Sequence, residues 1–146
     1  MAAAIMMGFF GQKKKKPDKR QPEKWSIASD CLNLILEGAK SIHPREFAGV
    51  LRIEKHTCKI TEVLLLPGTI QGEEHAVFHL HMLPIDFTVV GTVHSHPSPY
   101  PLPSEADLDL FGHFGRVHII AAKPYGAKSW RAYDHLGNPV KMEIVD

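Results

Sequence analysis

The sequence predicts an α/β or α+β sandwich, in which a β-sheet packs against helices. Two observations support this fold class. An amphipathic segment precedes two apolar, strand-like segments, and a second amphipathic segment is followed by further apolar strands. Because each helix or strand must bury its apolar side against another element, this order favours a mixed sheet covered by helices.

The first half of the chain predicts one helix and one hairpin. Ser26–Lys40 has helical periodicity, with Ser26 as the candidate N-cap and Gly38 near its end. Phe47–Ile53 and Lys59–Leu66 are rich in Val, Leu and Ile and flank a short polar run, which predicts two strands joined as a hairpin.

The second half predicts the remaining strands and a second helix. We expect a strand at Ala76–His81, a strand that ends at His94, a helix over Ser104–Phe114, a central strand at Val117–Ala122, and strands at Trp130–Asp134 and Val140–Val145. The region from Pro67 to Asp86 is expected to form a substrate-facing loop.

Composition and charge divide the chain into two parts. The 146 residues are 44% hydrophobic, which is enough for the core of one domain. Residues 1–24 hold seven Lys or Arg against Asp18 and Glu23, so the other 122 residues are net negative by four. We predict a flexible basic arm at 1–24 and a folded domain at 25–146. The apolar run that opens the arm is too short to span a bilayer and precedes the charges, unlike a secretory signal. We therefore expect a cytoplasmic protein without an integral membrane segment.

A candidate zinc site lies between residues 94 and 107. His94 and His96 are two residues apart at the end of a strand, so both imidazoles point to the same face. Prolines then prevent an immediate helix, which places Asp107 in the first turn of the following helix. Two neutral nitrogens and one carboxylate oxygen suit zinc and leave a fourth position for water.

Each part of this motif also has an ordinary structural explanation. Ser104 and Asp107 have the spacing of a capping box, and taken alone this reading is favoured. A second His-x-His pair, His79 and His81, has no carboxylate at the corresponding spacing, since Thr92 stands there. We interpret that second pair as ordinary strand histidines.

The cysteines and the large aromatic residues are expected to serve packing. Cys31 and Cys58 form no C-x-x-C pair, which argues against a second zinc site, and a disulfide between them is not expected in a reducing cytosol. Cys31 has helical spacing with Ile27, Leu34 and Ile35 on the first helix, so we expect Cys31 to pack in the core. Trp25, Trp130 and Tyr133 are interpreted as core or edge residues and not as a ligand-stacking set.

The run from Gly91 to Pro97, with Ser104 and Asp107 after it, resembles the signature of the JAMM, or MPN-plus, metalloprotease family. That signature is His-x-His, seven residues, then Ser-x-x-Asp, with a glutamate far upstream that corresponds to Glu46. The resemblance spans about residues 25–137 and is similar to the compact, single-domain archaeal members. It implies a mixed sheet flanked by helices, like that of cytidine deaminases.

The resemblance also implies a function. His94, His96 and Asp107 would hold one Zn²⁺ per chain, Glu46 would act as general base and acid, and Ser104 would stabilise the oxyanion. The expected reaction is hydrolysis after the C-terminal Gly-Gly of a ubiquitin-like small modifier or sulfur-carrier protein conjugated to lysine.

Other functions stay open from the sequence. The chain could be a non-catalytic MPN scaffold that binds modifiers or assembly partners, or a hydrolase of a sulfur-carrier adduct. The prolines around His96 also resemble bacterial RadC-like proteins, but we expect no nucleic-acid partner apart from a minor role of the basic arm. A homodimer is an open alternative to a monomer.

Overall fold

The structure is a computed structural model that describes residues 23–66 and 85–146. The predicted strand at Ala76–His81, most of the predicted arm and most of the predicted substrate-facing loop lie outside the described residues. The described residues form one eight-stranded mixed sheet in the order β7-β6-β5-β4-β2-β3-β1-β8. The elements are β1 (Trp25–Ala28), α2 (Ser29–Ile42), β2 (Ala48–Ile53), β3 (Lys59–Leu65), β4 (Val89–His96), α4 (Glu105–His113), β5 (Val117–Ala122), β6 (Trp130–Asp134), β7 (Pro139–Val140) and β8 (Met142–Val145).

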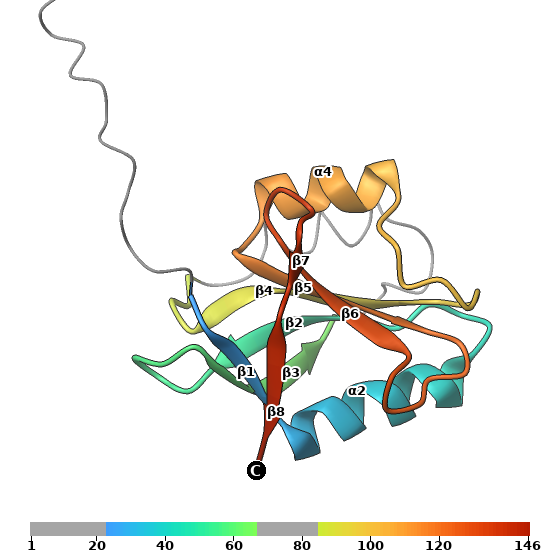
Figure 1. The fold of residues 1–146 in the computed structure, drawn as a ribbon, viewed down its shortest axis with the longest axis horizontal. Helices are drawn as coiled ribbons and strands as arrows, with labels where there is room; N and C mark the ends of the chain where they lie inside the picture. Colours follow the sequence, from blue (N-terminus) through green and yellow to red (C-terminus); the bar gives the residue numbers. More distant parts are fainter. Residues whose placement is uncertain (1–22, 67–84) are drawn as a thin grey trace, which may run out of the picture.

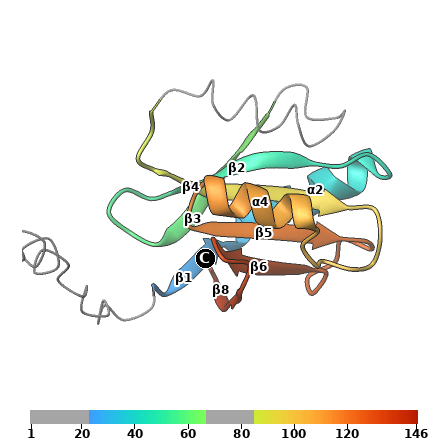
Figure 2. The ribbon, with the colours of Figure 1, turned by 90° about the horizontal axis from the view of Figure 1, so that it is seen from above.

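The two helices cover opposite faces of the sheet, with α4 above it and α2 below it in Figure 1. Figure 2 looks down on α4, which lies over the central strands β4 and β5 and runs along them. Helix α2 buries Leu32, Ile35 and Ala39 in the main core cluster with residues of β2, β4 and β5. Helix α4 buries Phe111 against Ile120 and Tyr133 on the other face. The predicted sandwich of helices and a mixed sheet is therefore confirmed.

The central strands agree closely with the sequence prediction. All six residues of β5 are buried, and this strand pairs with β4 in parallel and with β6 in antiparallel orientation. Strands β2 and β3 form the predicted antiparallel hairpin. Gly91 in β4 allows the close approach of β5, because a Cβ there would lie 1.5 Å from the Val117 carbonyl oxygen.

The predicted start of the first helix is wrong. Ser26 is not the N-cap: Trp25–Ala28 forms β1, and the helix begins only after Ala28, which makes no side-chain capping bond. The reason is long-range pairing, since β1 lies between β3 and β8 and is parallel to both. Ile27 is fully buried as a strand residue, whereas Leu34, which has helical spacing with Cys31, is 60% exposed.

The last predicted strand, Val140–Val145, is divided in two. It breaks at Lys141, so that β7 pairs with β6 at one end of the sheet order and β8 pairs with β1 at the other. Only Lys141 therefore separates β7 and β8, the strands at the two ends of the sheet order, and Figure 1 shows the chain running directly from one into the other.

The cysteines and aromatic residues serve packing, as expected. Cys31 is buried and Cys58 is half-buried, and both are free thiols. Trp25 and Tyr133 are buried, and Trp130 is half-buried with its Nε1 donating to the Ala127 carbonyl. Neither described helix is long and apolar enough to cross a membrane.

Candidate metal centre

Strand β4 presents the two histidines on the face of the sheet that α4 covers. The parallel register with β5 sets His94 opposite Ile120 and His96 opposite Ala122. Alternation along β4 turns Ser95 to the other face, where it is fully buried and its Oγ accepts the Phe47 N–H at 2.8 Å. The Phe47 carbonyl in turn accepts the Ser95 N–H at 2.9 Å. This reciprocal pair fixes the end of β4 that bears the histidines.

Helix α4 brings Asp107 back to the same point. Ser104 is its N-cap, and both bonds of a capping box are present: Ser104 Oγ accepts the Asp107 N–H at 3.1 Å, and Asp107 Oδ2 accepts the Ser104 N–H at 2.9 Å. The Asp107 carboxylate thus caps the helix and also lies beside both histidines. The capping box that the spacing of Ser104 and Asp107 indicated is therefore present.

His94, His96 and Asp107 form the one group of three or more His, Cys, Asp or Glu side chains, among the described residues, whose donor atoms could hold a metal ion. The two Nε2 atoms are 3.2 Å apart, His94 Nε2 is 3.0 Å from Asp107 Oδ1, and His96 Nε2 is 3.2 Å from Asp107 Oδ2. Zinc–donor distances of about 2.0–2.2 Å at tetrahedral angles place donors about 3.3–3.6 Å apart. The donor separations are only slightly shorter, so the residues present fit a zinc ion.

Hydrogen bonds prepare these side chains for a cation. The Nδ1 of His96 lies 3.0 Å from the Tyr100 carbonyl oxygen, which only accepts, so Nδ1 carries the proton and a neutral ring has its Nε2 lone pair free. The pKa of His96 is raised, first by its hydrogen bond with Asp107, against the effect of burial. Burial alone would raise the pKa of Asp107, but the bonds from both histidines, the charge of His94 and the Ser104 N–H together hold it far below its usual value. A carboxylate in this setting stays ionised at neutral pH.

Glu46 lies two residues before β2, beside the strand end that bears His96. Ala48 pairs with His94, and the bonds between Phe47 and Ser95 continue this antiparallel register toward Glu46 and His96. The charge of Glu46 contributes to raising the pKa values of both His96 and Tyr125, after larger effects of hydrogen bonding and burial. The side chain is exposed and makes no hydrogen bond or ion pair within 23–66 or 85–146.

The Ser104 hydroxyl remains able to donate. Its oxygen accepts from Asp107, while none of the hydrogen bonds among the described residues uses its proton. Ser104 is exposed at the helix start, one bond away from the carboxylate that contacts both histidines. His94 and His96 at the end of β4 and Asp107 at the start of α4 are therefore brought together, Ser104 is bonded to Asp107, and Glu46 lies two residues before β2.

A buried aromatic layer lies beneath the histidines and was not predicted. The Phe111 ring stacks on the His118 ring at 4.2 Å between centroids and 14° between planes, and it lies 6.5 Å from the His94 ring. Thr92 Oγ1 is 2.7 Å from His118 Nδ1. His118, fully buried on β5, could have been found from alternation along that strand, which sets it on the same face as Ile120.

The segment between β4 and α4 is fixed by hydrogen bonds to its backbone. The Tyr133 hydroxyl donates to the Pro101 carbonyl at 2.5 Å, and the Lys123 N–H donates to the Ser98 carbonyl at 3.0 Å. With the His96 bond to Tyr100, these contacts hold the proline-rich segment that leads to Ser104. The prolines were visible in the sequence, but their distant partners were not.

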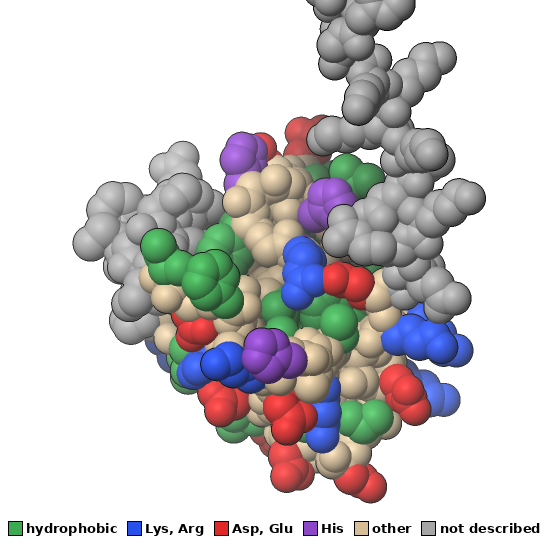
Figure 3. Space-filling model, turned by 90° about the vertical axis from the view of Figure 1, so that its left-hand side faces the viewer, with side chains coloured by type: hydrophobic (Ala, Val, Ile, Leu, Met, Phe, Trp, Pro, Cys, Tyr) green, Lys and Arg blue, Asp and Glu red, His purple; other side chains and the backbone are tan. Residues whose placement is uncertain are grey.

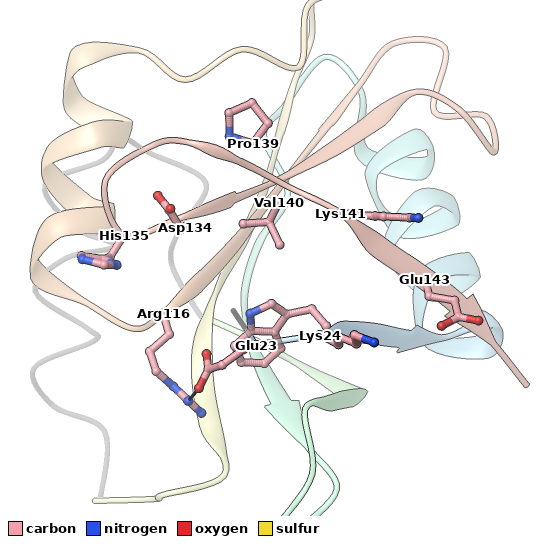
Figure 4. A pocket seen from close by; sticks show the side chains of 10 residues that line it. Glu23, Lys24, Arg116, Asp134, His135, Pro139, Val140, Lys141 and Glu143 are labelled. Atoms are coloured by element: carbon pink, nitrogen blue, oxygen red, sulfur yellow. Dashed lines mark hydrogen bonds and ion pairs between the residues drawn. The ribbon is translucent and has the colours of Figure 1, made fainter. Parts of the chain in front are cut away.

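A cavity of about 790 Å³ lies away from the metal centre, around the start of β1 (Figure 4). Arg116 lies over the Trp25 ring at 5.2 Å and pairs with Glu23 in its wall. Its other charged side chains include Lys141 and Glu143, so neither sign dominates. Figure 3 likewise shows acidic and basic side chains interspersed on one face of the molecule. None of the five predicted site residues lines this cavity.

Comparison with known proteins identifies the family. Residues 28–133 match the family model described as prokaryotic homologs of the JAB domain. A protein of Haloferax volcanii named a probable metalloprotease is 38% identical over 135 residues, which cover 87% of this chain and 83% of the relative.

Two solved structures support the same assignment. A JAB1/MPN domain protein from Archaeoglobus fulgidus is 42% identical, covers 83% of this chain and 99% of its own, and has a TM-score of 0.67. A structure described as JAMM, a metalloprotease-like zinc site in the proteasome and signalosome, is 38% identical, covers 84% and 99%, and has a TM-score of 0.65. The chain belongs to the JAMM/MPN family, as its sequence motif predicted.

Proposed function

We propose that this protein is a zinc-dependent isopeptidase of the cytoplasm that hydrolyses the bond after the C-terminal Gly-Gly of a ubiquitin-like modifier or sulfur-carrier protein. The observation that supports it most is the cluster of His94, His96 and Asp107, whose donor atoms are 3.0–3.2 Å apart. The "probable metalloprotease" name of the Haloferax volcanii relative agrees with it.

The three donors would hold the ion through two histidine nitrogens and a carboxylate oxygen. A zinc ion bound there supplies Lewis-acid activation of a water molecule, which lowers the pKa of that water towards about 7. Asp107 contributes the negative charge, and the Tyr100 carbonyl keeps the His96 Nε2 lone pair directed at the site.

Glu46 and Ser104 would act on the substrate. Glu46, exposed and without a partner among the described residues, accepts the proton of the attacking water as a C–O bond forms at the scissile carbonyl. It returns that proton to the amine nitrogen as the C–N bond breaks. Ser104 donates its free hydroxyl proton to the carbonyl oxygen while negative charge develops there, and the capping bond from Asp107 holds the hydroxyl in place.

A Gly-Gly tail suits such a site on general grounds. Two glycines have no side chains, so the tail can lie extended in a narrow groove and bind through main-chain hydrogen bonds. Helix α4 ends at His113, and only three residues separate it from β5. The chain therefore has no long inserted segment after Asp107 that could contact the protein attached to the modifier. We therefore expect selectivity for the modifier and little selectivity for the protein attached to it.

Replacement of Glu46 by Gln separates an enzyme from a binding scaffold. We expect Glu46→Gln to retain one zinc per chain and to lose hydrolysis of a modifier–lysine conjugate by at least about 100-fold. Glu54→Gln, an exposed glutamate after β2, is the matched control and should keep full activity. Unchanged turnover in Glu46→Gln would refute the assigned role. A zinc-loaded wild-type protein that binds such conjugates without cleaving them would instead favour the scaffold.

A further inference from the structure

A buried tyrosine connects three segments around the candidate centre. Tyr125 is 5% exposed and lies in the turn after β5. Its hydroxyl lies 2.7 Å from His43 Nδ1 and donates to the His96 carbonyl oxygen at 3.3 Å. His43 ends α2, and His96 ends β4, so a single hydroxyl joins the helix end to the strand end that bears a predicted metal ligand.

The polarity of these two bonds follows from the single hydroxyl proton. The His96 carbonyl can only accept, so the Tyr125 hydroxyl gives its proton to that carbonyl. The hydroxyl oxygen is then free to accept from His43 in the tautomer that carries its proton on Nδ1. The His43 and Tyr125 rings also meet edge to face, with centroids 5.6 Å apart. Both members of the pair are thus held by more than one contact.

The backbone of Tyr125 is itself constrained. Its φ is +62°, in the left-handed region that few non-glycine residues adopt. Such a conformation persists where the surroundings determine it, and it concentrates at functional sites. The Tyr125 N–H donates to the Ala122 carbonyl at 2.8 Å, which closes the turn and directs the ring inward.

Glu46 lies between two sets of these bonds. On one side, three residues before it, His43 contacts Tyr125. On the other side, its neighbour Phe47 exchanges hydrogen bonds with Ser95. The segment between His43 and Phe47 is therefore anchored at both ends to the strand that bears the histidines.

We propose that the Tyr125 hydroxyl, held by His43, is a positioning group that fixes Glu46 relative to His94 and His96. This inference rests on the proposed function, in which Glu46 moves the proton. Tyr125 touches neither substrate nor metal in this account; it acts through the helix end and the strand end that it joins.

Tyr125→Phe tests the proposal, because it removes one oxygen atom and keeps the ring. In the zinc-loaded, full-length protein we expect kcat for the conjugate to fall about 10- to 100-fold, with KM and zinc content little changed. His43→Ala should give a similar loss, and the double variant should lose little more, since both changes break the same link. His43→Asn, whose side chain can still contact the hydroxyl, should recover part of the loss. His113→Ala, an exposed histidine at the end of α4, is the matched control and should have no effect.

A second measurement does not depend on activity. Amide hydrogen exchange at Phe47 should accelerate about tenfold in Tyr125→Phe, with or without zinc, while the amides of β5 keep their wild-type rates. If the exchange rate of Phe47 is unchanged, the proposal is wrong, whatever the protein hydrolyses. If exchange accelerates but wild-type protein cleaves no conjugate, the proposed function is wrong while the structural link stands. Additive losses in the double variant, or a loss explained wholly by missing zinc, would also overturn the positioning role.

Discussion

Acidification should destabilise this protein through His118. His118 is fully buried, its ring stacks on Phe111, and its Nδ1 accepts the Thr92 N–H at 3.3 Å. A proton on Nδ1 would break this bond and place a charge in an apolar layer. Burial, and secondly the charge of His94, accordingly lower the pKa of His118 from 6.5 to about 3.

The lowered pKa of His118 determines the direction and the size of the change in stability with pH. The unfolded chain binds a proton near pH 6.5 and the folded chain only near pH 3, so the contribution to stability is complete above pH 6.5 and declines as the pH falls towards 3. At about 1.4 kcal/mol per unit, the loss between pH 7 and pH 4.5 is roughly 2–3 kcal/mol. Asp107, with a lowered pKa, adds its own loss only below about pH 4.

Urea denaturation of zinc-free protein at several pH values measures this effect. His118→Phe keeps a ring against Phe111 and cannot titrate. Its free energy of unfolding should therefore fall by roughly 2–3 kcal/mol less than that of wild type between pH 7 and pH 4.5. His118→Phe also leaves the Thr92 N–H without its acceptor, which lowers the free energy of unfolding by the same amount at every pH. This constant loss does not alter the comparison of how the two free energies change with pH. Parallel pH profiles of the two proteins would refute the reasoning.

Three further predictions concern the site and the sheet. Asp107→Asn should weaken zinc binding at least about 100-fold in a competition titration, because the charge is lost while a capping oxygen remains. The control variant Asp109→Asn, on the same helix, should bind zinc as tightly as wild type. Equal zinc affinities of the two variants would contradict the ligand assignment. Ser104→Ala should lower kcat by about 100- to 1,000-fold and the free energy of unfolding by about 1 kcal/mol. Ser104→Thr, which keeps the hydroxyl, should retain most of the activity and most of the stability. An unchanged kcat in Ser104→Ala would leave Ser104 with the capping role alone. Gly91→Ala should lower the free energy of unfolding by about 3 kcal/mol or more, since its Cβ would overlap the facing strand β5. Gly112→Ala in α4 meets nothing within 4 Å and should raise the free energy of unfolding by about 0.5–1 kcal/mol. Similar denaturation midpoints for the two variants would show that the overlap at Gly91 costs little.

The grouping of His94, His96 and Asp107 was predictable because its geometry is local. The two-residue period of a strand sets His94 and His96 on one face, and the start of α4 returns Asp107 to it. The same locality explains the success with β5 and α4. Glu46 was found only through the family motif, since its proximity to His96 depends on the pairing of β2 with β4.

The failures all involve partners that are distant in sequence. Helical periodicity placed Ser26 at a helix start, but parallel pairing with β3 and β8 makes that segment a strand. The break at Lys141 arises because β7 and β8 pair with strands at opposite ends of the sheet. Tyr125 reaches residues 29 and 82 positions away, and no local pattern encodes such contacts.

Cleavage of a modifier joined to lysine by an isopeptide bond tests the central claim most directly. Purified protein is assayed as prepared, after treatment with a chelator, and after zinc is restored, with Asp107→Asn in parallel. We predict cleavage after the terminal glycine that disappears with the chelator, returns with zinc and is absent in the variant. Cleavage that persists in the metal-free protein, or none by wild-type protein with one zinc bound per chain, would contradict a zinc isopeptidase at His94, His96 and Asp107.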